Sequence, residues 1–192
     1  MPIDDQVEQA MRRWPNVPSV HGWLRLDRRG RWMLIDRGRP GFDEARDAQG
    51  SEITSPPILD FLGRNYRADA QGRWHWQNGP QRVFVDIDLA PLLVRVLGDA
   101  GTGAGGDGAG GLVTHTGFAL AAPSRAWMDG EGNLFLETEL GPAAVHDLDL
   151  AQLDFEGDGP LPERVRLAGR WLTLGFLDDA AAALGFQRRP RG

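Results

Sequence analysis

The sequence predicts an α+β protein dominated by antiparallel β-hairpins, with a duplicated core and few short helices. Two repeated phrases carry this prediction. The first has the pattern Asp-x-x-Gly-(Arg/Asn)-(Trp/Leu), and it occurs at 27–32, 69–74 and 129–134. The second, Asp-x-Asp-Leu-Ala, follows two of these turns at a similar distance, at 86–90 and 147–151. Because glycine supplies the positive φ of a tight hairpin turn, the phrases indicate divergent duplication of one hairpin-rich unit.

The N-terminal half, residues 1–64, is expected to combine two helices with one hairpin. Apolar residues recur at helical spacing from residue 4 to 14. Ser55 followed by two prolines and an apolar run is a typical helix start. The polar stretch 38–52 is rich in Gly, Asp and Arg, so we expect a loop there.

The C-terminal half, residues 65–192, is expected to form a curled sheet or partial barrel. Segments of alternating or apolar residues predict its strands at 66–68, 73–77, 82–89, 92–97, 112–121, 126–128, 133–139, 143–146, 164–167 and 170–174. Residues 98–111 are almost pure Gly, Ala, Asp and Thr, which predicts a flexible loop. We expect a short Ala-rich helix at 180–184 and a frayed basic tail at 187–192.

Composition narrows the partners and the location. The formal net charge of −6 argues against a nucleic-acid partner, since phosphate neutralisation drives that kind of binding. No apolar run approaches the roughly 20 residues of a membrane span, so no membrane association is expected. The sequence has no cysteine and its start lacks an export signal, which favours the cytoplasm. The four histidines are scattered, so neither a metal site nor a cofactor is expected.

Two features carry a family resemblance, namely the stretch 72–85 and the order of the predicted elements. Residues 72–85 read Gly-Arg-Trp-His-Trp-Gln-Asn-Gly-Pro-Gln-Arg-Val-Phe-Val and resemble small uncharacterised proteobacterial proteins with an Asn-Gly-Pro-Gln-Arg-Val signature. The order of hairpin, polar loop, short helix, Asp-x-x-Gly hairpin and Pro-led strand is remotely similar to the bacterial family domain of unknown function twelve-eighty-five. That resemblance implies a duplicated core, a C-terminal half resembling a pleckstrin-homology barrel, and a ligand site between the halves for a nucleotide-like molecule.

The same stretch supplies the candidate site. Five neighbouring residues are suited to bind a small molecule: Trp74, Trp76, Asn78, Gln81 and Arg82. His75 separates the two tryptophans on one strand, so both indoles face the same side and can stack on a planar ligand. Arg82 can hold a carboxylate or phosphate through two hydrogen bonds. The alternative interpretation is that the tryptophans fill the core, that Asn78 and Gly79 form a turn, and that Arg82 is a surface charge.

Three functions remain open on the sequence alone. The first is a non-catalytic small-ligand-binding or regulatory module, as in signal transduction, whose nucleotide-like or otherwise anionic ligand binds between the two halves. The second is a protein-interaction subunit or homodimer, which an exposed tryptophan patch would favour. The third is an enzyme of unrecognised class using Asp86, Asp88 or His75, since such groups transfer protons.

Overall fold

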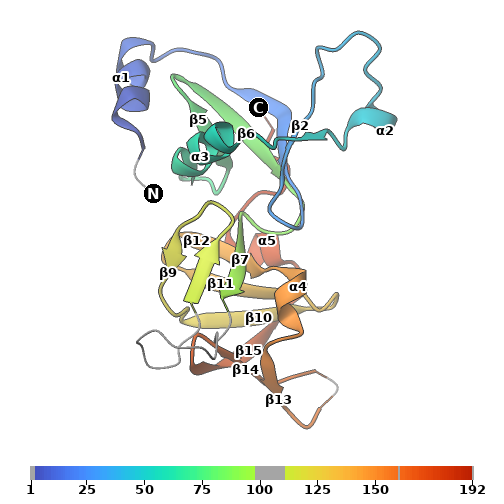
Figure 1. Cartoon of the computed structure of the whole chain (residues 1–192). Coiled ribbons are helices and arrows are strands. Elements are labelled where there is room, and N and C mark those ends of the chain that lie inside the picture. Colours follow the sequence, from blue (N-terminus) through green and yellow to red (C-terminus); the bar gives the residue numbers. More distant parts are fainter. Residues whose placement is uncertain (1–2, 98–110, 160, 192) are drawn as a thin grey trace. The chain divides into compact units, whose positions relative to one another are not determined.

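The chain divides into two compact units. The computed structural model describes residues 3–97, 111–159 and 161–191, so the expected loop at 98–111 lies, apart from Gly111, outside the described residues. Unit 1 is Met1–Leu89 with Gly185–Gly192, and unit 2 is Ala90–Leu184 (Figure 1). The boundary expected after residue 64 therefore falls inside unit 1. Residues from both sides of that boundary join one sheet, because residues 81–87 pair with residues 20–26.

Unit 1 is built on a six-stranded sheet with the strand order β3-β2-β1-β6-β5-β4. Its strands are β1 (Val20–Leu26), β2 (Trp32–Leu34), β3 (Ser51–Glu52), β4 (Tyr66–Ala68), β5 (Trp74–Asn78) and β6 (Gln81–Ile87). Neighbouring strands are antiparallel, except that β1 and β6 run parallel. The helices of its described part are α1 (Asp5–Arg13), α2 (Glu44–Asp47) and α3 (Pro56–Arg64). The stretch 38–52, expected to be a loop, thus contains α2 and β3, and the Asp43 side chain caps α2 by accepting the Arg46 N–H.

Unit 2 carries a nine-stranded curled sheet with the order β13-β14-β15-β10-β11-β12-β7-β8-β9. Its strands are β7 (Leu92–Leu97), β8 (Gly111–Thr114), β9 (Ala119–Leu120), β10 (Arg125–Asp129), β11 (Leu134–Thr138), β12 (Gly141–Val145), β13 (Asp154–Glu156), β14 (Arg164–Leu167) and β15 (Arg170–Leu177). Two short helices, α4 (Asp147–Leu150) and α5 (Ala180–Leu184), accompany the sheet in the described residues. The α+β class, the few short helices and the curled C-terminal sheet are confirmed.

Both units share one strand plan. Six neighbouring strands of unit 2, β10-β11-β12-β7-β8-β9, repeat the order β4-β5-β6-β1-β2-β3 of unit 1. Each equivalent pair has the same orientation, including the single parallel pair, which is β1 with β6 in one unit and β7 with β12 in the other. Unit 2 adds β15, β14 and β13 beyond β10. The topology therefore supports the duplication that the repeated phrases predicted.

The repeated Asp-x-x-Gly phrase is one hydrogen-bonded turn. Asp69 Oδ1 accepts the N–H groups of Gln71 and Arg73 at 2.9 and 3.0 Å, and Oδ2 accepts Arg73 Nε at 2.8 Å. Asp27 and Asp129 hold their turns with the same three kinds of hydrogen bond. The aspartate therefore organises the turn, and the residue after the glycine is Arg or Asn because its side chain donates back to that aspartate.

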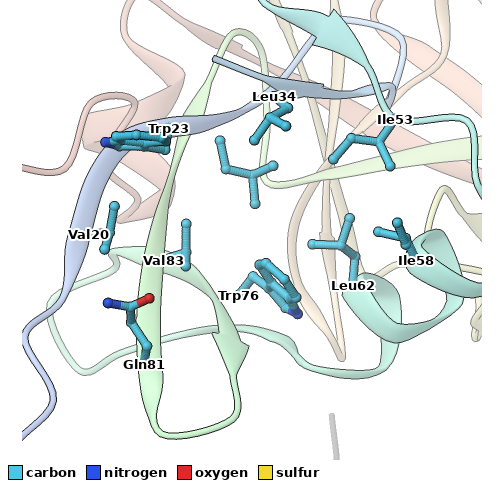
Figure 2. A pocket seen from close by; sticks show the side chains of 10 residues that line it. Val20, Trp23, Leu34, Ile53, Ile58, Leu62, Trp76, Gln81 and Val83 are labelled. Atoms are coloured by element: carbon cyan, nitrogen blue, oxygen red, sulfur yellow. The ribbon is translucent and has the colours of Figure 1, made fainter. Parts of the chain in front are cut away.

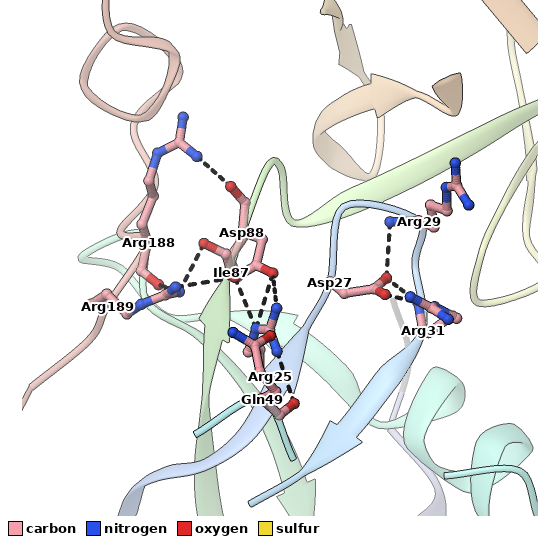
Figure 3. Close-up of polar contacts among 9 residues, drawn as sticks. All are labelled: Arg25, Asp27, Arg29, Arg31, Gln49, Ile87, Asp88, Arg188 and Arg189. Carbon is pink, nitrogen blue, oxygen red and sulfur yellow. Dashed lines mark hydrogen bonds and ion pairs between the residues drawn. The ribbon is translucent and has the colours of Figure 1, made fainter. Parts of the chain in front are cut away.

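The C-terminal tail is held by unit 1, contrary to the expected fraying. The Ile87 N–H donates to the Arg188 carbonyl at 2.8 Å, which ties the tail to the end of β6. Arg189 Nη2 donates to Asp88 Oδ1 at 3.0 Å (Figure 3). Acidic groups at the end of β6 thus bind arginines of the basic tail, a long-range contact that no local sequence pattern reveals.

Candidate functional site

Unit 1 contains a cavity of about 450 Å³, called here the apolar pocket (Figure 2). Its wall comes from β1, β2, β5, β6, α3 and Ile53, which directly follows β3. The lining residues are Val20, Trp23, Leu24, Leu34, Ile53, Ile58, Leu62, Trp76, Gln81 and Val83. Figure 2 shows side chains of α3 on one side of this space and side chains of the sheet on the other. None of the ten lining residues is ionisable, so the pocket favours an uncharged occupant.

Helix α3 forms one side of the pocket. Ser55 precedes its first turn, and two prolines occupy the first helical positions, where no N–H is needed. Leu62 is fully buried and anchors the helix against the sheet, which contributes about 2 kcal/mol. Ile58, one turn earlier on the same face, stays 46% exposed. The helix is therefore fixed at its C-terminal part and leaves an open side next to Ile58.

Trp76 gives the pocket an aromatic wall. It lies on β5 opposite Val83, and its ring meets Phe61 of α3 edge to face, with the centroids 5.8 Å apart. Its Nε1 is buried and has no hydrogen-bond partner among the described residues. A buried N–H without an acceptor costs about 1–3 kcal/mol. Trp76 is thus a half-buried side chain with apolar surface toward the pocket and an unused donor.

Trp74, in contrast, lies in the core. It is only 3% exposed and packs against Tyr66, with the ring centroids 4.8 Å apart. It does not line the pocket. Trp74 is therefore a core residue, as the alternative interpretation expected. Of the two tryptophans, only Trp76 lines a cavity in which a ligand could bind.

The three polar members of the predicted site separate. Gln81 lines the apolar pocket, and its Nε2 donates to the Pro18 carbonyl at 3.1 Å. Asn78 is exposed at the end of β5 and pairs in register with Gln81 across a two-residue turn. Arg82 is also exposed, but successive residues of a strand point to opposite faces, so Arg82 faces away from Gln81 and Val83.

Arg82 lines a second cavity on that opposite face, of about 370 Å³, called here the polar cavity. The other lining residues are Met11, Trp14, Pro15, Val17, Ser19, Gln77 and Pro80. The structure thus distributes the predicted residues over two faces of one sheet. Sequence reasoning missed the aliphatic wall of the apolar pocket, because apolar residues of strands and helices look like ordinary core. The one available signal was the helix start at Ser55, which placed a helix beside this sheet.

The residues considered for proton transfer are held in other roles. Arg25 donates to both carboxylate oxygens of Asp88, with distances of 2.6–3.0 Å (Figure 3). Burial raises the pKa of Asp88, but hydrogen bonds from Arg25 and Arg189 outweigh it and hold the pKa below its usual value. Asp86 is buried and accepts from Arg191 at 3.3 Å. Both carboxylates therefore take part in structural ion pairs.

His75 is buried and neutral. Its pKa is lowered to about 4, mainly by burial, and the charges of Arg82 and Arg67 contribute to this shift. Neither ring nitrogen has a hydrogen-bond partner among the described residues, and the ring lies 5.5 Å from that of Phe84. Its environment resembles that of an apolar core residue.

The described residues contain neither a cluster of metal-binding side chains nor a helix that could span a membrane. No group of three or more His, Asp or Glu side chains among residues 3–97, 111–159 and 161–191 is arranged to hold a metal ion. Over the same ranges, no helix combines the length and apolar character needed to cross a bilayer.

Fold and site together define an α+β protein with two copies of a six-stranded sheet and an apolar pocket in the first copy. The family DUF2944, described as "Protein of unknown function (DUF2946)", matches residues 3–191, so the chain belongs to this family. No curated protein matches the chain.

The chain is similar to two solved structures. A DUF1285 family protein from Silicibacter pomeroyi DSS-3 has a TM-score of 0.51 and 18% sequence identity, and the match covers 83% of each chain. A DUF1285 family protein from Shewanella baltica OS155 has a TM-score of 0.46 and 11% identity, covering 68% of this chain and 88% of that one. The predicted remote similarity to this bacterial family is confirmed, at the level of the fold.

Proposed function

We propose that this protein is a non-catalytic small-ligand-binding module whose ligand occupies the apolar pocket of unit 1. The observation that supports the proposal is the pocket itself, about 450 Å³ with two indoles, those of Trp23 and Trp76, in its wall. Small-molecule sites are typically clefts of about 300–1,000 Å³ with apolar walls and few polar groups. We place this role in the cytoplasm and regard it as regulatory, in keeping with a sequence that has no cysteine.

The wall defines the chemistry of the ligand. Indole faces and aliphatic side chains favour a planar, mostly apolar molecule, since stacking and burial of apolar surface both contribute to its affinity. Gln81 is the polar group of the wall, and its Nε2 already donates to the Pro18 carbonyl. In the described part of the chain no hydrogen bond engages its Oε1, so this atom suits a ligand with one N–H or O–H donor. An uncharged heteroaromatic ring, such as that of a nucleobase, meets these requirements.

The test is a binding titration with neutral heteroaromatic probes, namely indole, adenine and caffeine, followed by calorimetry and thermal unfolding. A probe at 100 times its dissociation constant should stabilise the folded protein by about 2.7 kcal/mol. Trp76→Leu should weaken binding at least tenfold, because the indole wall is lost. Trp171→Leu, which removes a partly buried tryptophan of unit 2, is the matched control and should leave binding unchanged.

A second variant separates a blocked pocket from a disturbed fold. Ile58 is 46% exposed at the open side, so Ile58→Arg should fill the entrance without disturbing the core, while Ile58→Ala should keep the entrance open. Loss of binding in Ile58→Arg with normal unfolding midpoints would support the proposal. Equal binding by wild type, Ile58→Arg and Trp76→Leu, or no binding of any probe, would contradict it.

A further inference from the structure

The polar cavity of unit 1 differs in chemistry from the apolar pocket on the other face of the same sheet. It lies beside the end of α1 and the segment 14–19, and its floor includes Gln77 and Arg82. These two residues are directly opposite each other in the register of β5 and β6. A buried amide and an exposed guanidinium therefore adjoin one space of about 370 Å³.

Arg82 differs from several other arginines of unit 1 in its lack of a carboxylate partner among the described residues. Arg25, Arg73 and Arg64 each bind a carboxylate of unit 1, at 2.6, 2.8 and 3.2 Å respectively. In the described part of the chain, no hydrogen bond or ion pair engages Arg82. An arginine without a carboxylate keeps all five donors available to an incoming anion.

A second positive charge reinforces the first. Burial is the main cause that lowers the pKa of Arg67, and the like charge of Arg82 contributes to the same shift. Glu8 partly offsets this shift, but its carboxylate also binds Arg12 at 3.1 Å. The same two charges disfavour protonation of His75. An anion beside Arg82 would offset these like charges.

Gln77 supplies the complementary group. It is fully buried, and its Nε2 donates to the Gly79 carbonyl at 2.9 Å. That bond fixes the orientation of the amide and leaves Oε1 as an acceptor with no donor among the described residues. A buried acceptor without a donor is costly, so a ligand that brings an O–H or N–H group gains by satisfying it.

From this arrangement we infer that the polar cavity is a second binding site, for a small carboxylate or phosphate anion that also carries a hydroxyl or amino group. The anionic group binds the guanidinium of Arg82, and the donor binds Oε1 of Gln77. The site is independent of the apolar pocket, because the two cavities share no lining residue and lie on opposite faces of the sheet.

The experiment is a calorimetric titration of the full chain with glycerol 3-phosphate and with glycerate, which carry the two anionic groups together with hydroxyls. Methyl phosphate and acetate, both fully ionised at mildly alkaline pH, serve as hydroxyl-free counterparts. We expect one hydroxyl-bearing probe to bind at least tenfold more tightly than its hydroxyl-free counterpart, and the better of the two identifies the anionic group. Binding of none of the four, or equal binding with and without hydroxyls, would overturn the inference.

Three variants locate the site. Arg82→Gln removes an exposed charge without disturbing the core and should weaken binding at least tenfold, whereas Arg170→Gln, an equal change in charge on an exposed residue of unit 2, should leave it unchanged. Gln77→Met keeps the volume and removes the acceptor, so it should abolish the preference for the hydroxyl-bearing probe. Equal losses in Arg82→Gln and Arg170→Gln would mean attraction to general surface charge only, and would contradict the site. Trp76→Leu should not affect these anions, which keeps this test separate from that of the apolar pocket.

Discussion

Strands β5 of unit 1 and β11 of unit 2 occupy the same place in the repeated sheet and follow the same Asp-x-x-Gly turn. The first carries Trp74, His75 and Trp76, and the second carries Leu, Phe and Leu at positions 134–136. The three residues of unit 2 are completely buried. In unit 1, Trp76 is only half-buried and lines the apolar pocket. The same strand position is thus part of a closed core in unit 2 and part of a cavity wall in unit 1.

The connections between strands account for the difference. In unit 1 the chain between β3 and β4 contains α3, which supplies Ile58 and Leu62 to the pocket. In unit 2 only residues 121–124 separate β9 from β10, and β10 gains β15 as a further neighbour. Duplicated sheets therefore preserve the strand order, while the insertions between strands determine where a cavity forms.

An ion pair is also duplicated, and removing its aspartate should cause the largest loss of stability among the variants considered. Arg25 binds Asp88 in unit 1, and Arg95 binds Asp149 in unit 2, each through two nitrogens of one guanidinium. Asp88→Ala should cost about 3–5 kcal/mol, because the Arg25 side chain is only 16% exposed and loses its carboxylate. Asp149→Ala should cost about 1–3 kcal/mol, because the Arg95 side chain is 49% exposed and can turn to water. Urea unfolding at neutral pH, followed by circular dichroism, measures both, and a larger loss in Asp149→Ala would contradict this order.

Replacing the glycine in either of the two equivalent turns should cause the next largest loss of stability. Gly72 and Gly132 both have positive φ, +71° and +81°, so alanine at either costs about 1–2 kcal/mol of strain. A Cβ at Gly72 would in addition collide with the Gly185 carbonyl oxygen, whereas nothing lies within 4 Å of a Cβ at Gly132. Gly72→Ala should therefore cost at least about 3 kcal/mol and release the C-terminal tail. Carboxypeptidase digestion would detect the release, and equal resistance of the two variants would show that the tail does not depend on this contact.

Because His75 is buried in unit 1, we expect the stability of this unit to depend on pH. Its pKa of about 4 lies below the usual value of 6.5, so the unfolded chain binds the proton more tightly and stability falls as the pH falls through this window. The loss between pH 7 and pH 5 should be about 2 kcal/mol. His75→Phe introduces the residue that stands at position 135 of unit 2, and should flatten this part of the pH profile. Urea midpoints at several pH values test it, and an unchanged slope in His75→Phe would assign the pH dependence to other groups.

Exchanging the turn residues between the copies should have the smallest effect. Asn133 Nδ2 donates to Asp129 at 2.8 Å, as Arg73 Nε does to Asp69 at the same distance. Arg73→Asn should therefore cost less than about 1 kcal/mol, mainly from the lost contact of the guanidinium with the Phe84 ring. Arg73→Ala, which removes the donor as well, should cost more. Thermal unfolding of the two variants compares them, and equal losses would mean that the side-chain hydrogen bond contributes nothing.

Much of the local structure was predictable because its causes lie within a few residues. The Asp-x-x-Gly turns, the helix that begins after Ser55 and the alternating strand β6 each follow from short-range hydrogen bonding or periodicity. The stretch 38–52 was misjudged for the opposite reason. Its short strand β3 is stable only through pairing with Met33 and Leu34 of β2, a contact that a polar local sequence does not reveal.

The candidate site was predictable only in part. Sequence alternation correctly separated His75 from the two tryptophans, yet it did not show that Trp74 packs on Tyr66 while Trp76 lines a cavity. The same alternation already implied that Arg82 and Gln81 point to opposite faces of β6, a consequence that the predicted five-residue site ignored.

By itself, the sequence determined the fold class, the repeated turn and the duplicated hairpin plan, since each depends on residue spacing and on the conformations that glycine, proline and aspartate allow. Tertiary structure alone decided the limits of the two units, through the parallel pairing of β1 with β6, and the fate of the basic tail, through its contacts with Asp88. It also decided which of the two tryptophans of β5 lines a cavity. Burial depends on what packs against a side chain, and in this protein the packing partners come from distant parts of the chain.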